Sequence, residues 1–345
     1  MRLTTLALYT RQFSALFSSG VSVVRALTVL SGGPDQTMNR ALTDVATGVA
    51  RGESLSKSLS RHPALFSSFY VQLIRLGEAT GSLDRVLEQL ASYLEANARQ
   101  RERLQTALYY PAMQLQAAVV VLGLLVTFVV PQLEPLLTHL GVPLPWPTRL
   151  LVEATRFLTS PLTWVVLAMF YPSWLVIARD VERVDTLRLR RAEFLDRLPI
   201  LGRLRRLQTQ ARTLDALGLL LESGLPFPEA LAVLQDATDD PLTRQRLQQA
   251  QTDLHLCRAE TLADLFEANQ VFQGASAQML RCAEETGQMV GMLRKASALL
   301  DLEAGLTLEM IMALLEPLIM AFIGLMVGAI VISAYLPLVQ VLTGL

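Results

Sequence analysis

The stretch Gly77-Glu78-Ala79-Thr80-Gly81-Ser82-Leu83 returns as Ala283-Glu284-Glu285-Thr286-Gly287-Gln288-Met289, 206 residues later. A second pair agrees at nearly the same offset, because residues 19–27 read SGVSVVRAL and residues 223–231 read SGLPFPEAL, 204 residues apart. Pro111 and Pro317, each at the start of an apolar run, also differ by 206. Three colinear matches at nearly one offset indicate that the chain is a duplicated unit.

Each copy has the pattern of helices joined by short turns. Apolar residues recur at spacings of three and four, which is typical of amphipathic helices, and they include Leu6, Tyr9, Phe13, Leu16, Phe17, Leu83, Val86, Leu87, Leu90 and Leu94. Gly20 is the expected end of the first such helix, and Asp35 is the expected cap of a later one. No alternating strand pattern of useful length is present. The sequence therefore predicts an all-α protein with about six helices per copy, packed as an antiparallel bundle.

Three uncharged stretches are long enough to cross a bilayer. The mean hydropathy of +0.38 is too apolar for an ordinary soluble chain. Residues 112–130 would form about 28 Å of helix, close to the ~30 Å hydrocarbon core of a bilayer. Residues 157–178 form a weaker span, and the third follows Glu316 with its clearest core at 318–336. Gly324 and Gly328 form a GxxxG pair there, which favours close helix contact but also arises by chance.

The arginines predict the orientation of these spans. They cluster before the first span and after the second, which the positive-inside rule assigns to the cytoplasm. We expect a cytoplasmic N-terminus without a signal peptide, and a C-terminus outside. The predicted parts are a helical domain at 1–110, spans at 111–131, 157–178 and 317–338, an outside (periplasmic) loop at 132–156, a basic segment with the second helical domain at 179–316, and an outside tail at 339–345. The basic segment 179–206 is either a solvated helix or a lipid- or protein-binding site.

The composition excludes several function classes. A net charge of −1 provides no overall field for nucleic acid. The three histidines are scattered, so no metal site is expected, and the two cysteines, Cys257 and Cys282, are expected to be free and buried. No GxxxxGK[ST] loop, GxSxG elbow or HExxH helix occurs, which predicts a protein that is not an enzyme and needs no cofactor. A transporter or channel subunit is the alternative, although the three spans lack interior ionisable groups; a membrane-tethered adaptor is a third.

The sequence resembles the type II secretion protein F family, which includes type IV pilus platform proteins. The motifs that carry the resemblance lie along nearly the whole chain: Leu16-Phe17-Ser18-Ser19-Gly20, Gly52-Glu53-Ser54-Leu55-Ser56, Pro63-x-x-Phe66, the Gly77–Leu83 stretch, Ala107-Leu108-Tyr109-Tyr110-Pro111, Leu144-Pro145-Trp146-Pro147-Thr148-Arg149, Arg197-Leu198-Pro199-Ile200-Leu201-Gly202 and Leu315-Glu316-Pro317. Ala283 departs from the family, which often has glycine there, so a glycine-only backbone conformation is doubtful at that position. Arg258–Leu262 is a degenerate counterpart of the second motif.

The resemblance implies an inner-membrane platform that acts as a scaffold. Such a protein would couple a cytoplasmic hexameric assembly ATPase to the assembly of pilin or pseudopilin subunits, contact other inner-membrane assembly proteins, and form a homo-oligomer. The short segment before the first motif favours the pilus branch over the secretion branch. The candidate structural or interface residues are those of the motifs: Gly20, Gly77, Glu78, Gly81, Pro111, Pro199, Gly202, Gly224, Glu284, Gly287, Glu316, Pro317, Gly324 and Gly328.

Three carboxylates in this set have two interpretations each. Glu78 and Glu284 occupy equivalent positions, so each is either a partner-binding or domain-interface carboxylate, or a polar group that holds a helix–turn junction, and the last interpretation is favoured. Glu316 lies at the cytoplasmic mouth of the third span, where a desolvated charge is costly unless it is paired. It either pairs with an arginine or a pilin helix, or lies in water.

Overall fold

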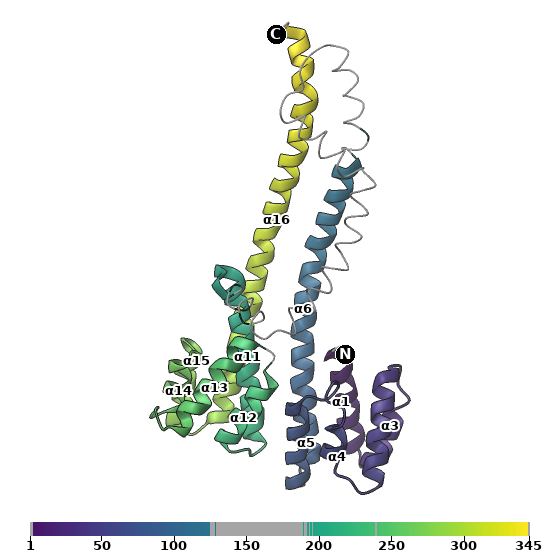
Figure 1. Cartoon of the computed structure of the whole chain (residues 1–345), viewed down its shortest axis with the longest axis vertical. Coiled ribbons are helices and arrows are strands. Elements are labelled where there is room, and N and C mark those ends of the chain that lie inside the picture. Colours follow the sequence, from purple (N-terminus) through teal and green to yellow (C-terminus); the bar gives the residue numbers. More distant parts are fainter. Residues whose placement is uncertain are drawn as a thin grey trace. The chain divides into compact units, whose positions relative to one another are not determined.

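The structure is a computed structural model that describes residues 3–124, 128, 189, 192, 194, 196–238 and 240–343, and its regular elements there are all helices (Figure 1). The predicted second span and the outside loop at 132–156 lie outside the described residues. The chain divides into two compact units, Met1–Arg103 with Arg188–Leu308, and Leu104–Leu187 with Glu309–Leu345.

The first copy folds into α1 (Leu3–Ser18), α2 (Val23–Leu30), α3 (Gln36–Ala50), α4 (Leu55–Leu59), α5 (Ser68–Thr80) and α6 (Leu83–Leu124). Asp35 caps α3 as predicted, because its carboxylate accepts hydrogen bonds from the backbone N–H groups of Thr37 at 2.9 Å and Met38 at 3.2 Å. Gly20 ends α1 in a left-handed conformation with φ +82°. Figure 1 shows α1, α4 and α5 beside the first part of α6, with α3 on the far side of α1.

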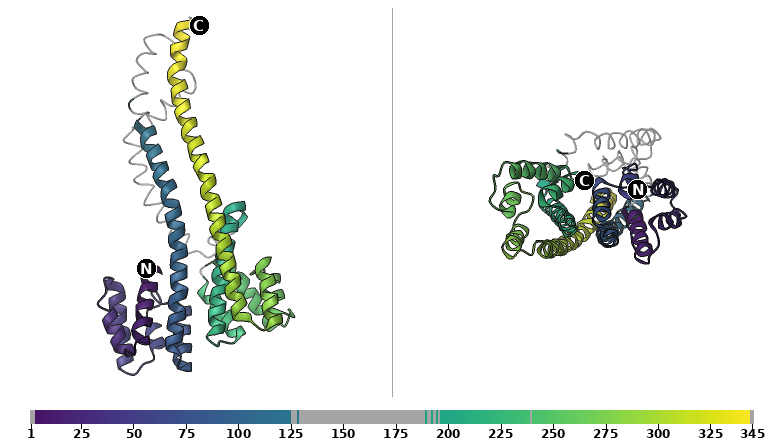
Figure 2. Two further views of the ribbon diagram at one scale, coloured as in Figure 1. Left: turned by 180° about the vertical axis from the view of Figure 1, so that it is seen from behind. Right: turned by 90° about the horizontal axis from the view of Figure 1, so that it is seen from below.

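The second copy repeats the same order with α11 (Pro199–Glu222), α12 (Phe227–Ala237), α13 (Pro241–His255), α14 (Leu262–Ala268), α15 (Ala275–Thr286) and α16 (Met289–Thr343). Asp240 caps α13 by accepting from the backbone N–H of Thr243 at 2.9 Å, as Asp35 caps α3. In Figure 2 the green helices of this copy lie against the first part of α16, drawn in yellow-green.

The apolar stripes predicted from residue spacing form the core of the first unit. On α1, Tyr9 and Phe13 are buried while the other stripe residues are partly buried against the core. In the second copy the core includes Phe266 and Phe272, whose rings meet edge to face with centroids 4.8 Å apart. Each fully buried leucine or phenylalanine contributes roughly 1.5–3 kcal/mol relative to an exposed one, so these stripes hold the short helices against α6 and α16.

The two span-opening prolines do not begin helices. α6 continues through Pro111, and α16 continues through Pro317. A proline inside a helix lacks one N–H donor and crowds the preceding turn, but the long helices on both sides keep the chain helical. The boundaries between the two units fall earlier, after Arg103 and after Leu308.

One helix of the described residues is long and apolar enough to cross a membrane. It is Met289–Gly328 within α16, where an 18-residue window reaches a mean hydropathy of 2.3 and is 0% buried. The first predicted span is described only as far as Leu124 and at Phe128, and its large apolar side chains there are mostly exposed, including Met113, Leu115, Val120, Val121, Leu124 and Phe128.

Candidate functional site

The most regular feature of the two copies is a partly buried helix cap, made by Glu78 in the first copy and by Glu284 in the second. In the first copy, the Glu78 carboxylate accepts hydrogen bonds from the backbone N–H groups of Leu55 at 2.5 Å and Ser56 at 3.1 Å. These N–H groups open α4 and have no partner within the helix. The acceptor is an anion at the positive end of a helix, an arrangement that strengthens both hydrogen bonds.

The second copy repeats this geometry almost atom for atom. Glu284 accepts from the backbone N–H of Leu262 at 2.6 Å and of Ala263 at 3.1 Å, at the start of α14. The caps of the two short helices also correspond, because Ser54 accepts from Lys57 N and Thr261 accepts from Asp264 N. The two glutamates therefore each join α5 or α15 to a short helix within their own copy. A further role in partner binding stays a prediction.

The glycines next to these glutamates are required for two different structural reasons. Gly81 and Gly287 end α5 and α15 in the left-handed conformation, at φ +65° and +67°. Gly77 has no positive φ; instead, a Cβ there would lie 3.1 Å from atoms of Leu83 and Val86 on α6. The equivalent Ala283 is fully buried, so the second copy accommodates that Cβ. Ala283 is not among the residues with a positive φ, so the structure agrees with the expectation that this position does not require glycine.

The other motif residues are placed as follows. Gly224 has φ +89° and ends α11 as Gly20 ends α1. Pro199 is the first residue of α11, and Gly202 packs so closely on the Asp196 backbone that a Cβ would collide with it. Glu316 is exposed, and among the described residues it has no ion pair. Gly324 and Gly328 have no described atom near the place of a Cβ, so their role in helix contact stays a prediction.

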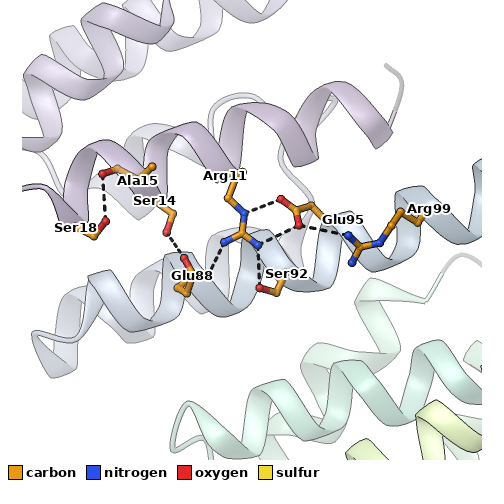
Figure 3. A network of polar contacts seen from close by, with 8 residues as sticks. All are labelled: Arg11, Ser14, Ala15, Ser18, Glu88, Ser92, Glu95 and Arg99. Atoms are coloured by element: carbon orange, nitrogen blue, oxygen red, sulfur yellow. Dashed lines mark hydrogen bonds and ion pairs between the residues drawn. The ribbon is translucent and has the colours of Figure 1, made fainter.

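An ion-pair network that the sequence did not reveal joins α1 to α6 (Figure 3). Arg11 donates from Nε to Glu95 at 2.6 Å and from Nη1 to Glu88 at 2.5 Å, and its Nη2 bonds Ser92 at 3.0 Å. Ser14 donates to the second oxygen of Glu88 at 3.0 Å. Hydrogen bonds from Arg11 lower the pKa of both carboxyls below the usual value. The available signal was Arg11 itself, which is the one charged residue of α1, while Glu88 and Glu95 lie seven residues apart on α6.

The two cysteines are free, as expected, but the prediction that they are buried is wrong. Cys257 follows the end of α13 with φ +50°, and Cys282 lies on the outer face of α15. Spacing could not reveal this, because a single cysteine carries no periodic signal. Within the described ranges, no group of three His, Cys, Asp or Glu side chains could hold a metal ion.

The fold and the paired caps define a duplicated, all-helical protein with an exposed apolar helix. Comparison with known proteins identifies its family. The profile of the family described as type II secretion system (T2SS), protein F, matches residues 9–131 and 213–337. The two matched segments start 204 residues apart and end 206 residues apart, the same offsets as the sequence repeats. The chain therefore belongs to the type II secretion system protein F family.

Curated relatives come from two kinds of machine. Type IV pilus assembly protein PilC of Thermus thermophilus is 33% identical over 349 residues, which cover 99% of this chain and 83% of the relative. Type II secretion system protein F of Pseudomonas aeruginosa is 30% identical and covers 97% of this chain and 82% of the relative. Type IV pilus assembly protein TapC of Aeromonas hydrophila is 26% identical over 96% of this chain and 80% of its own length.

Proposed function

We propose that this chain is an inner-membrane platform protein of a type IV pilus or a type II secretion machine. The observation that carries the proposal is the match of both copies to one family profile. Relatives named for pilus assembly and for secretion align with nearly the whole chain. This supports a general assembly role and leaves the branch to experiment.

The proposed arrangement has two helical domains in the cytoplasm, at 1–110 and 179–316, and three spans at 111–131, 157–178 and 317–338. The loop at 132–156 and the tail at 339–345 lie outside. The long apolar helix within α16 and the exposed apolar side chains of α6 support the first and third spans. The arginines beside the predicted spans support the orientation.

In this role the chain acts as a scaffold and takes its energy from a partner. It binds a cytoplasmic hexameric assembly ATPase and transmits that movement to pilin or pseudopilin subunits, which leave the membrane. It also associates with copies of itself and with other inner-membrane assembly proteins. The absence of a nucleotide-binding loop from the sequence supports a separate energy source.

The first experiment deletes the gene and restores it on a plasmid. Surface filaments, secreted proteins and membrane-bound pilin are then measured in the deleted and restored cells. Lost filaments with pilin retained in the inner membrane support the platform function in the pilus branch, and lost secretion with filaments intact supports the secretion branch. Normal filaments and normal secretion, in a strain without a second copy of the gene, contradict the proposal.

The orientation is tested with the two exposed cysteines. In intact spheroplasts, a membrane-impermeant maleimide should leave Cys257 and Cys282 unlabelled until the membrane is permeabilised. A variant with both cysteines replaced by serine and Thr138 replaced by cysteine should react without permeabilisation, because residue 138 lies in the predicted outside loop. Labelling of Cys257 in intact spheroplasts would reverse the proposed topology.

Glu316 is tested by a complementation experiment with a matched control. Glu316→Gln should impair filament assembly or self-association if the carboxylate pairs with an arginine or a pilin helix, because the neutral amide cannot form an ion pair. Glu309→Gln is the control, since Glu309 is exposed on the same helix. Equal assembly by both variants would show that Glu316 is an interfacial carboxylate in water.

A further inference from the structure

The two copies touch each other, inside the first compact unit, through one side of α6 and one side of α11. At one end, Arg85 of α6 pairs with Glu222 of α11 at 3.5 Å. At the other end, Arg212 of α11 donates from Nε to Gln100 Oε1 of α6 at 3.1 Å, and Gln100 also donates to Asp301 of α16. The neighbouring helices α5 and α12 touch as well. We call this arrangement the internal contact.

The internal contact covers a stripe of α11 that is open on the equivalent helix α1. Ala216 and Leu219 lie on α11 between the two polar contacts, and both are buried. The repeat offset of 204 residues places Gln12 and Ala15 of α1 at these positions, and both are exposed. Since each copy packs its own helices in the same order, the first copy is what covers the stripe of α11. No described residue covers the stripe of α1.

Exposed apolar side chains extend this open surface of the first copy. Leu8 of α1 is 56% exposed and stands at the position of Arg212. On α2, Val29 is 58% exposed, whereas its equivalent on α12, Val233, is partly buried against the core. Among the described helices, α12 touches α5 but α2 makes no comparable contact with α15. We call the exposed residues of α1 at this surface, Leu8, Gln12 and Ala15, the α1 face.

The equivalent of the α6 side is an exposed row of leucines on α16. The repeat offset of 206 residues places Leu306 at the position of Gln100, and Leu302 and Leu299 precede it at spacings of four and three. This spacing puts all three on one side of the helix. Leu302 and Leu306 are 61% and 57% exposed, and Leu299 is 40% exposed. Contiguous exposed apolar side chains of this kind mark a surface that binds another molecule.

The charges around this leucine row argue against a lipid cover. Charged side chains lie before, within and after the row, at Lys295, Asp301, Glu303 and Glu309. Such a density of charge is costly inside a bilayer, and the proposed third span begins later, at residue 317. The cover of the row is therefore sought in a protein surface on the cytoplasmic side.

We propose that the leucine row of α16 binds the α1 face of a second copy of this chain, so that the contact between chains repeats the internal contact between copies. The proposal rests on the self-association in the proposed function and names its surface. Both sides differ from the internal contact in the same sense, because the hydrogen-bonded Gln100 and Arg212 are replaced by Leu306 and Leu8. Two apolar groups suit each other, whereas a polar group opposite a leucine would lose its hydrogen bond.

The symmetry of the assembly follows from the two faces. They differ, so the contact is heterologous, and its repetition forms a closed ring if the rotation closes and an open row if it does not. Because both copies are proposed to lie on the same side of the membrane, repeating the internal contact keeps every helical domain in the cytoplasm.

Cross-linking between two differently tagged full-length chains tests this contact in membranes. Both chains have their native cysteines replaced by serine. One chain carries Leu8→Cys and the other carries Leu306→Cys, at the positions equivalent to the hydrogen-bonded pair of the internal contact. A short bismaleimide should join them into a product that carries both tags. Since each chain has one cysteine, a cross-link within a chain cannot produce this signal.

A matched pair of exposed positions is the control. Thr43→Cys on α3 and Gln248→Cys on α13 should give no product with both tags. The proposal is overturned if Leu8→Cys and Leu306→Cys give no more mixed product than this control. It is also overturned if the product forms only between two Leu306→Cys chains, because two leucine rows would then pack on each other.

A substitution in the row tests its contribution to binding. Leu302→Glu should weaken the association of the two tagged chains, measured by co-purification in nanodiscs, by roughly 10- to 100-fold, the value of one buried leucine. Leu256→Glu is the control, since Leu256 is 54% exposed outside the row. Equal association of the two variants contradicts the proposal. These measurements do not involve filaments or secretion, so a negative result leaves the platform function to the gene-deletion experiment.

Discussion

Replacing Glu78 by glutamine tests whether the repeated carboxylate is the element that holds the short helix in place. The Glu78 carboxylate accepts two backbone N–H groups at the start of α4. A glutamine side chain has one oxygen and one NH₂ group, so one N–H of α4 loses its acceptor and faces a second donor. The substitution changes only the charge and one acceptor, with almost the same volume.

The expected cost can be estimated from these contacts. A hydrogen bond to a charged group contributes roughly 1.5–3 kcal/mol, and an anion at a helix N-terminus adds about 0.3–1 kcal/mol. The remaining oxygen of the glutamine keeps part of this stabilisation. The free energy of local opening of α4 should therefore fall by about 2 kcal/mol, which raises the opening constant by about 30-fold.

The assay is hydrogen exchange of α4 and α5 peptides in the full chain. Glu284→Gln has matched geometry, so it should give a similar loss in α14 and α15 and leave α4 unchanged. Glu285→Gln is the control, because Glu285 is the exposed neighbour of Glu284. If Glu78→Gln or Glu284→Gln exchanges no faster than Glu285→Gln, the cap is not what stabilises the short helices.

Three further substitutions test the first copy. Arg11→Gln should lower the free energy of unfolding by about 1 kcal/mol at neutral pH. Because Arg11 lowers the pKa of Glu88 and Glu95, this stabilisation is present above the usual pKa of a glutamate and is lost as pH falls through the lowered pKa values. The denaturation curves of variant and wild type should therefore converge in acid. Gly77→Ala should destabilise the contact of α5 with α6 by about 1 kcal/mol, because a Cβ there lies 3.1 Å from α6, and a thermal shift would detect it. Gly81→Ala should cost about 1–2 kcal/mol through its left-handed backbone, with urea denaturation as the measurement.

The helices and the repeat could be predicted because both leave local signals. The stripe through Tyr9 and Phe13 predicted α1, and Asp35 predicted the start of α3 through its capping chemistry. The continuation of α6 through Pro111 could not be predicted in this way, because a proline signals a boundary unless the segments on both sides hold the helix together.

The polar networks were less accessible to sequence reasoning. A hydrogen bond between Glu78 and Leu55 joins residues 23 positions apart, and no spacing rule connects them. The duplication provided the useful clue, because Glu78 and Glu284 recur at one offset and so share one structural reason. It could not tell a helix cap from a partner-binding group, since both preserve a glutamate.

The two copies differ where physical constraints differ. Both keep the groups that satisfy backbone N–H donors, because a buried N–H without an acceptor is costly in either copy. The pairs Asp35 and Asp240, and Glu78 and Glu284, are of this kind. Side-chain charges carry no such constraint, because one cation–anion pair can be replaced by a different arrangement of charges if other side chains balance the charge that remains.

At Arg11 and Asp215 this freedom has an energetic consequence. In the first copy, Arg11 pairs with Glu88 and Glu95, and this pairing strengthens as the two acids ionise. In the second copy, Asp215 stands at the position of Arg11, 204 residues later, and the negative charge of Asp301 acts on it. The packing around Asp215 therefore weakens as these two acids ionise. The stabilities of the two copies should therefore respond to pH in opposite directions, and Asp215→Arg should remove the repulsion by placing a cation beside Asp301. If the second copy of Asp215→Arg still loses protection between pH 5.0 and pH 7.5, the repulsion between the two carboxylates is not the cause of its pH response.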